Sequence, residues 1–287
     1  MLSWISTRIG GGNDDNYIFP TVNPQEDGPD CSKDCADCTV RLPNKFNVET
    51  ERKLYGKVKP FTTHVLVATG KSDWASHPDN ERGTVIHALS EASSNERLRV
   101  NASNLVAHND EGKDSDKATT VLLLPSFEYV DNVTTNSVPE LVSRYIDNRH
   151  SSAPSPSNSQ LVSRPCEHDY VVLLCSHQRR DARCGISAPL IKKELERHLR
   201  PAGLYRDAND ERPGGVGIYF VSHVGGHKFS ANVLVYRKKE EQLIWLARIR
   251  PEHCEGLVKY TILQGKVVHP ESQLRGGFDK ARGVTSW

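Results

Sequence analysis

The chain has 287 residues, of which 25% are charged and 37% hydrophobic, a composition typical of a globular protein large enough to bury a core. Its 37 basic and 36 acidic residues leave a net charge of +1, which gives no electrostatic reason to expect a nucleic-acid partner. No apolar run approaches the roughly 20 residues of a membrane span, and residues 1–19 match neither a secretory signal nor a mitochondrial presequence. We therefore expect a cytoplasmic protein with no nucleic-acid or membrane partner.

The first 147 residues are expected to form an N-terminal domain with a loop-rich start. Residues 1–45 are rich in Gly, Pro, Asn and Asp, which favour loops. Beyond them, apolar patterns predict a strand, a helix, a second strand and a second helix, in that order, at 64–69, 84–91, 119–124 and 139–147.

A Ser/Pro-rich stretch at residues 148–164 predicts a linker, because its composition cannot build a core. The region 165–287 is more regular. It predicts a strand, a helix, three strands and a final helix, at 170–174, 188–199, 216–221, 232–236, 243–249 and 251–263. Pro189 falls in the first turn of the first of these helices, where proline is tolerated. The order of elements predicts an α/β layer like a thioredoxin fold.

Four metal-ligating side chains follow two of these strands. Cys175 and Cys184 lie on one predicted loop between a strand and a helix, and His223 and His227 lie on another loop after a strand. Sites of α/β folds gather at such strand ends, and the glycines between the two histidines let that loop bend tightly. Two thiolates and two imidazoles suit zinc or an iron–sulfur centre. Eight residues between the cysteines are more than a zinc knuckle usually has, so both metals stay open at this point.

The sequence also resembles a known family over these residues. The runs CSHQRRDARCG at 175–185 and HVGGHKFSANVLVY at 223–236, with RGG at 275–277, resemble the sucrase/ferredoxin-like family of the actin-patches-distal type. The similarity extends more weakly to the family's N-terminal half, over 57–150. It implies two thioredoxin-like domains, the C-terminal one a thioredoxin-like ferredoxin with a bis-histidinyl, non-Rieske 2Fe–2S cluster.

Carried over one at a time, Cys175 and Cys184 match the family's cysteine ligands, and His223 and His227 match its histidine ligands. We expect both cysteines on one iron and both histidines on the other. Two neutral imidazoles in place of thiolates make the cluster less negative, so its potential should exceed that of an all-cysteine ferredoxin. An imidazole N–H near the iron should couple electron uptake to proton uptake.

These properties predict a one-electron transfer protein with unidentified redox donor and acceptor proteins, acting in cytosolic redox homeostasis. The sequence contains no Ser/His/Asp arrangement, Walker loop or dinucleotide fingerprint. We therefore do not predict an independent catalytic turnover. One alternative is a structural zinc-binding interaction module. Another is a thiol oxidoreductase that uses a second group of cysteines nearer the N-terminus, and a cluster-based sensor of nitric oxide or peroxide is also open.

Neighbouring residues have open roles. Arg179, Arg180 and Arg183 either steer an acidic redox partner or form a solvated loop in which Asp181 pairs with one of them. His177, between the two thiols, is expected to pack beside the ligands rather than to ligate. Two further expectations are that Lys228 tunes charge and that Trp245 belongs to the core.

Cys31, Cys35 and Cys38 form a second cysteine group, which could be a redox-active thiol set, a zinc site or reduced surface thiols. Cys166 and Cys254 are expected to be structural. The chain ends in Thr285-Ser286-Trp287, which is similar to the tail by which the cytosolic iron–sulfur assembly machinery recognises some of its clients. Thr285 replaces the usual aliphatic residue there.

Overall fold

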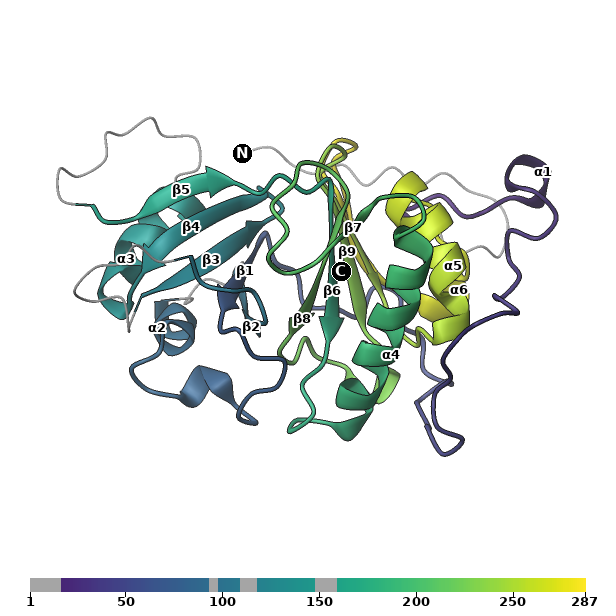
Figure 1. Ribbon diagram of the computed structural model, residues 1–287, viewed down its shortest axis with the longest axis horizontal. Helices are drawn as coiled ribbons and strands as arrows, with labels where there is room; N and C mark the ends of the chain where they lie inside the picture. Colours follow the sequence, from purple (N-terminus) through teal and green to yellow (C-terminus); the bar gives the residue numbers. More distant parts are fainter. Residues whose placement is uncertain (1–16, 93–97, 109–117, 148–158) are drawn as a thin grey trace.

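The computed structural model describes residues 17–92, 98–108, 118–147 and 159–287 (Figure 1). Within these residues, helices pack on a 12-stranded sheet, which confirms the predicted mixed α/β class. Along one path the strand order is β12-β11-β10-β9-β6-β8-β2-β1-β3-β4-β5, and β7 pairs with β8 off this path. The two halves of the chain therefore share one sheet.

The N-terminal half contributes β1 to β5. Its elements in chain order are β1 (Thr63–Ala68), α2 (Val85–Ala92), β2 (Leu98–Ser103), β3 (Thr119–Leu124), β4 (Glu128–Val133), α3 (Val138–Leu141), the π-helical turn η4 (Val142–Asp147) and β5 (Val162–Pro165). β1 pairs in parallel with β2 and antiparallel with β3, and β3 pairs antiparallel with β4. β5 pairs with β4, so the last residues of the expected linker lie at a sheet edge, whereas 148–158 lie outside the described residues.

The C-terminal half repeats this connectivity. It contains β6 (Tyr170–Cys175), α4 (Ala182–Leu199), β7 (Tyr205–Arg206), β8 (Val216–Val221), β9 (Val233–Arg237), β10 (Gln242–Leu246), the helical turns η6 (Pro251–His253), α5 (Cys254–Gly256) and η7 (Leu257–Ile262), then α6 (Pro270–Gln273), β11 (Leu274–Asp279) and β12 (Val284–Ser286). β6 pairs in parallel with β8 and antiparallel with β9, and β9 pairs antiparallel with β10. The helix predicted at 251–263 is confirmed as one continuous helical segment, which passes from 3-10 through α to π geometry.

The two halves meet where β2 and β8 end. Ser103 pairs with Val221, and the chain continues the contact as the Ser222 amide donates to the Ala102 carbonyl at 2.9 Å. Across this seam the order β4-β3-β1-β2 is followed by β8-β6-β9-β10, so each half presents its second parallel strand to the other. The ligand-bearing end of β8 consequently lies against the N-terminal half.

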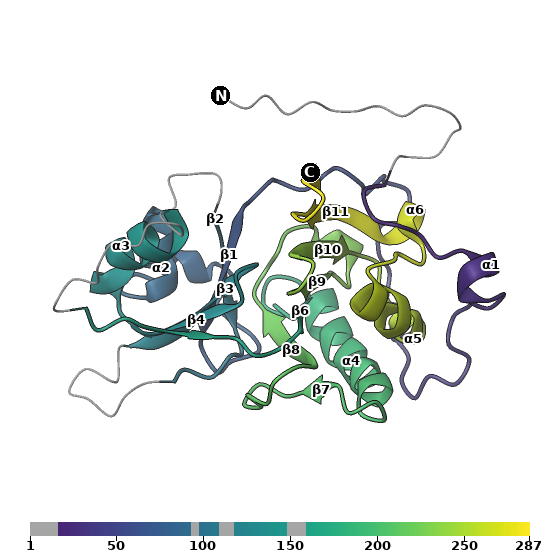
Figure 2. The same ribbon diagram turned by 90° about the horizontal axis from the view of Figure 1, so that it is seen from above.

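Alternate residues of the central strands enter different cores. In β6, Leu173 and Cys175 join a core shared by the two halves, whereas Val172 and Leu174 pack toward α4. In β1, Leu66 enters the shared core, and its neighbours pack under the helices of the N-terminal half. Figure 2 shows those helices, α2 and α3, on the opposite side of the molecule from α4 and α5. The shared core thus places the start of the cysteine segment in an apolar interior.

The segment before β1, residues 17–58, lies on the C-terminal half, although the sequence assigned it to the N-terminal domain. It contains α1 (Pro24–Asp27) and runs past α5 and α6 as the purple trace of Figures 1 and 2. The Thr21 bridge to Val267 and the bond from the Gly56 amide to the Arg275 carbonyl, 3.0 Å, fasten it. We call this segment the strap. Among the described residues, no helix is long and apolar enough to cross a membrane.

Candidate metal centre

The thiol pair and the imidazole pair leave the same edge of the sheet. β6 and β8 are parallel neighbours, and Cys175, the last residue of β6, is in register with Val221, the last residue of β8. The chain segments that follow Cys175 and Val221 therefore start close together in space. Cys175 is the last strand residue rather than the first loop residue, and its side chain is 1% exposed.

Cys184 lies in the first turn of α4, not on a loop as the sequence suggested. The helix begins at Ala182 because the Asp181 carboxylate caps it, accepting a hydrogen bond from the Arg183 amide at 3.0 Å. Pro189 is accordingly inside α4 rather than in its first turn. The early start fixes the Cys184 side chain on a rigid element, where it is 1% exposed.

The two thiols contact each other. A hydrogen bond from the Cys184 thiol lowers the pKa of Cys175 well below its ordinary value, despite burial, and the same contact together with burial raises the pKa of Cys184. The His223 ring also lowers the pKa of Cys175. The Ser230 hydroxyl is 3.9 Å from Cys184 Sγ. The contact between the two thiols thus favours the thiolate form of Cys175 over that of Cys184, and the thiolate is the form that binds metals.

The two imidazoles lie side by side. Their ring centroids are 5.1 Å apart, with planes tilted by 38°. The bend between them is made by Gly226, whose φ of +70° places His227 at the start of the 3-10 turn η5 (His227–Phe229). The Nδ1 atoms of both rings are buried and have no hydrogen-bond partner within the described part of the chain. Buried polar atoms are almost always paired, so these two nitrogens fit a missing ligand.

Backbone contacts from both halves hold the histidine loop. The Asn101 amide of β2 donates to the His223 carbonyl at 3.1 Å, and Arg275 Nη1 donates to the Gly225 carbonyl at 3.0 Å. Asn232 donates to the Gly226 carbonyl at 3.1 Å and accepts from Arg275 at 2.7 Å. Asn101 and Arg275 lie far from the loop in sequence, whereas Asn232 follows Gly226 by six residues, and Asn101 was not predicted from sequence.

His177 is fully engaged elsewhere. Its Nδ1 accepts from the His223 amide at 3.1 Å, and its Nε2 lies 3.1 Å and 2.9 Å from the carbonyl oxygens of Trp74 and Ala75. With both ring nitrogens in use and the side chain 0% exposed, this histidine positions the loop that carries His223.

Charges around the cysteine segment are partly paired. Arg183 binds Asp181 through two nitrogens, at 2.9 Å and 2.8 Å, which confirms the alternative that Asp181 neutralises one arginine. Asp181 Oδ2 also lies 3.9 Å from His227 Nε2. Burial, first of all, lowers the pKa of His227. Trp245 is 0% exposed, which confirms its predicted place in the core.

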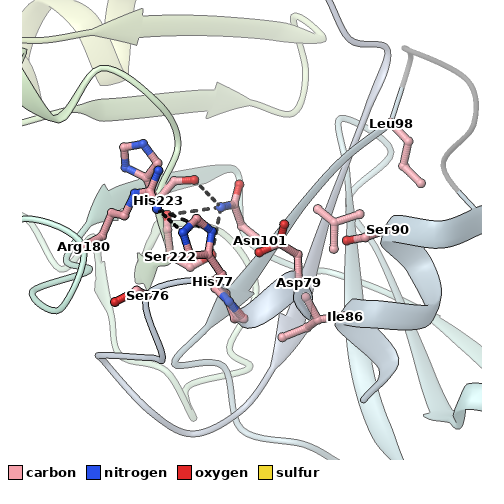
Figure 3. A pocket seen from close by; sticks show the side chains of 12 residues that line it. Ser76, His77, Asp79, Ile86, Ser90, Leu98, Asn101, Arg180, Ser222 and His223 are labelled. Carbon is pink, nitrogen blue, oxygen red and sulfur yellow. Dashed lines mark hydrogen bonds between the residues drawn. The ribbon is translucent and has the colours of Figure 1, made fainter. Parts of the chain in front are cut away.

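A cavity of about 320 Å³ at the seam between the halves reaches His223. Figure 3 shows His223 and Arg180 at one side of it and Leu98 and Ser90 at the other. Arg180 Nη1 lies 2.7 Å from His77 Nε2 at the rim. The thiols are thus enclosed, whereas His223 borders this cavity and the His227 side chain is partly exposed.

The donor set is wider than one ion requires. Within the described residues, one group of three His, Cys, Asp or Glu side chains has all its ligand atoms within 4.8 Å of one another, and that group contains none of Cys175, Cys184, His223 and His227. Ligands of one tetrahedral zinc lie only about 3.3–3.8 Å apart, as zinc–ligand distances of 2.0–2.3 Å require. The four predicted ligands are therefore not gathered as closely as the ligands of one bound zinc ion.

The remaining predicted residues lie apart from this centre. Cys31, Cys35 and Cys38 are on the strap, and Cys166 and Cys254 are buried free thiols. Trp287 is half-buried, with its ring centroid 5.1 Å from that of Phe61 and 6.0 Å from that of Phe278.

Comparison with known proteins identifies the family. Its model, described as sucrase/ferredoxin-like, matches residues 54–276, which include all four candidate ligands. Actin patches distal protein 1 of Saccharomyces cerevisiae is 38% identical over 151 residues, 50% of this chain and 46% of that protein. Altered inheritance of mitochondria protein 32 of Clavispora lusitaniae is 39% identical over 101 residues, 35% of this chain and 33% of that protein.

The protein of the same name from Eremothecium gossypii is 25% identical over 292 residues, 86% of this chain and 88% of that protein. The chain thus spans less than half the length of the first two relatives and most of the third. No solved structure matches it. Because the family model covers most of the chain and the resemblance seen in the sequence is thereby confirmed, the protein belongs to the sucrase/ferredoxin-like family.

Proposed function

We propose that the protein is a one-electron carrier whose 2Fe–2S cluster is held by Cys175, Cys184, His223 and His227. The observation that carries the proposal is the pair of buried, unpartnered Nδ1 atoms on His223 and His227, on the loop that starts beside Cys175. When bound, the cluster would supply reversible one-electron redox chemistry. The eight residues between the two cysteines, more than a zinc knuckle usually has, favour a cluster over the structural zinc alternative.

The same atoms suggest which nitrogens ligate. Nδ1 of each histidine is the enclosed atom, so we infer that Nδ1 binds iron and Nε2 faces outward. The His227 side chain is 39% exposed, and its Nε2 is the atom near Asp181. A proton on this nitrogen can therefore exchange with water, which supports electron transfer coupled to a proton.

Electrons would enter on the imidazole side, because both thiols are enclosed. Arg180 contacts His77 at the rim of the cavity, and the Arg179 side chain is 69% exposed beside Asp73. These two arginines, rather than the neutralised Arg183, support docking of a redox partner with an acidic surface.

The thiol oxidoreductase alternative is weaker, because burial, followed by a hydrogen bond to Asp37, raises the pKa of Cys35 to about 12. An attacking thiol needs the opposite shift. A cytoplasmic location and recognition of Trp287 by the iron–sulfur assembly machinery stay predictions. For the latter, Trp287 would have to leave Phe61 and Phe278.

The test is anaerobic purification followed by iron, sulfide and zinc analysis with visible and electron paramagnetic resonance spectra. We expect two irons and two sulfides per chain, and shifted spectra with a lowered potential in His223→Cys and His227→Cys. His87→Cys, a change on α2 outside the four predicted ligands, is the matched control and should leave the spectra unchanged. A colourless protein with one zinc bound by these four residues would contradict the proposal.

A further inference from the structure

The strap brings a second set of metal-ligating side chains to the far end of α4. Cys35 and Cys38 lie on the strap, His198 is the second-last residue of α4, and Glu255 is in α5. Along α4, His198 follows Cys184 by 14 residues, which corresponds to about 21 Å at 1.5 Å per residue. This set is therefore separate from the cluster ligands.

Three of these side chains converge. Cys35 Sγ, a ring nitrogen of His198 and a carboxylate oxygen of Glu255 lie within 4.8 Å of one another, and theirs is the group of this kind found among the described residues. A sulfur, an imidazole nitrogen and a carboxylate oxygen are the three ligand types that zinc takes in proteins. A contraction of about 1 Å would bring them to the spacing of one tetrahedral ion.

Cys38 is the candidate for the fourth ligand, and because its Sγ is not among the atoms that lie within 4.8 Å of one another, it would have to move toward them on binding. The sequence Cys35-Ala36-Asp37-Cys38 has the two-residue spacing of a zinc knuckle. Cys38 Sγ donates to the Cys35 carbonyl at 3.6 Å, so its side chain folds back over the first cysteine. Both thiols line a groove of about 640 Å³, through which an ion can enter.

A cation already lies between two of the donors. Arg197 Nη2 is 3.3 Å from Cys35 Sγ and 3.0 Å from His198 Nε2, so the guanidinium bridges them as an ion would. Arg197 is also bound to the buried Glu194 at 2.8 Å and lies 3.6 Å from Asp37. When an ion replaces Nη2, these two carboxylates can retain the guanidinium.

The strap is held in register for this contact. The Cys35 amide donates to the Glu252 carbonyl at 2.9 Å, and the Thr39 amide donates to the Glu194 carboxylate at 2.8 Å. Backbone bonds thus fix the segment on either side of the knuckle, so little further ordering is needed for binding.

We propose that Cys35, Cys38, His198 and Glu255 form a second metal site, which binds one Zn²⁺ and fastens the strap to α4 and α5. The donor atoms come from three separate segments, so the ion links parts of the chain that are distant in sequence. Because a closed set of four protein ligands leaves no position for substrate, the role is structural.

The test measures zinc in the full chain, purified anaerobically, by elemental analysis and by titration with Zn²⁺ and with Co²⁺ as a coloured probe. Wild type should bind one zinc and give a cobalt–thiolate absorption band. Cys35→Ser and His198→Asn should lose the zinc, and Glu255→Gln should bind it at least about 10-fold more weakly. Cys31→Ser, a buried strap cysteine outside the group, is the matched control and should keep it.

Iron, sulfide and the visible cluster spectrum are read in every variant. Their retention in a zinc-free variant establishes that the protein is folded and that the two sites are separate. If the cluster proposal fails, zinc at the strap is still measurable. Retention of zinc in both Cys35→Ser and His198→Asn would overturn the inference, as would a wild-type chain that takes up no Zn²⁺ and instead oxidises Cys35 and Cys38 to a disulfide.

Discussion

The Nδ1 atom of His177 accepts a hydrogen bond from the backbone amide of His223, over a distance of 3.1 Å. The other ring nitrogen of His177, Nε2, is hydrogen-bonded to the carbonyl oxygens of Trp74 and Ala75. A histidine beside the metal centre thus ties the start of the histidine loop to the segment after β1. It acts on the position of a ligand without being one.

Replacement of His177 by alanine should therefore lower both stability and metal retention. The change leaves the His223 amide and two carbonyl groups buried without partners, each at a cost of about 1–3 kcal/mol. We expect the free energy of unfolding to fall by at least about 2 kcal/mol and the iron content to drop, as measured by urea titration and iron analysis. His87→Ala, on the surface of α2, is the control. Equal stability and iron content in the two variants would count against this role.

Gly225 and Gly226 offer a matched pair of substitutions between the two histidines. Both have positive φ, +87° and +70°, so alanine strains the backbone by about 1–2 kcal/mol at either position. A Cβ at Gly225 meets open space, but one at Gly226 lies 2.9 Å from the Arg275 guanidinium. That contact would disturb the bonds from Arg275 to Gly225 and Asn232.

We expect Gly226→Ala to lose about 1.5–3 kcal/mol more than Gly225→Ala, the worth of a hydrogen bond to a charged group. Chemical denaturation of both variants measures the difference. If Gly225→Ala proved to be the more damaging change, the loop would not be held by Arg275 as described.

His64 makes the folded protein sensitive to acid. Burial, with the nearby charge of Arg99, lowers its pKa to about 3, and its ring is bonded to Tyr236 and Asn101, each at 2.9 Å. In the unfolded chain the pKa is about 6.5. Between pH 6.5 and 3 the unfolded state therefore holds a proton that the folded state lacks, so stability is present above this window and falls as the pH drops through it.

From pH 7 to pH 5 this histidine should remove about 2 kcal/mol of stability. Glutamine can keep both hydrogen bonds but does not titrate. His64→Gln should therefore reduce the loss of stability between pH 7 and pH 5 by that amount. Urea denaturation of wild type and variant at the two pH values gives the answer, and parallel curves for the two proteins would refute the assignment.

Asp181 should tune the proposed cluster through His227. The pKa of Asp181 is held below its ordinary value, first of all by Arg183, so the carboxylate is charged next to His227 Nε2. Asp181→Asn keeps the cap of α4 but removes this charge, so the reduction potential should rise and its dependence on pH should shift to lower pH. Potentiometric titration from pH 6 to pH 9 tests this, with Asp207→Asn as a control of equal charge change. A potential unaltered by Asp181→Asn would exclude the coupling.

The sequence predicted the position of a ligand correctly where that position follows directly from the strand before it. Cys175 and His223 follow apolar runs, and the register of β6 with β8 brings the ends of those runs together as expected. The start of α4 was predicted too late because proline is common in the first turn of a helix, so the helix was placed to begin next to Pro189. Asp181 is a typical N-cap residue and could have indicated the true start at Ala182.

Other features depend on partners far away along the chain. β2 was not predicted because it contains polar residues such as Asn101, which is buried only where the other half supplies partners. β11 was missed because Gly276 and Gly277 weaken a strand pattern, yet a Cβ at Gly277 would lie 1.9 Å from the Leu243 carbonyl oxygen. The convergence of Cys35 with His198 requires the tertiary structure.

The strap also sets an order of events during synthesis. Residues 17–58 leave the ribosome before α4, α5 and β11, yet these later elements supply the surface on which the strap lies. The N-terminal half has its own helices and a core beneath them, so this part can begin to form while translation continues, although its sheet and a second core are shared with the C-terminal half. The earlier segment therefore has no surface to dock on until residues as late as Val267 and Arg275 have been made.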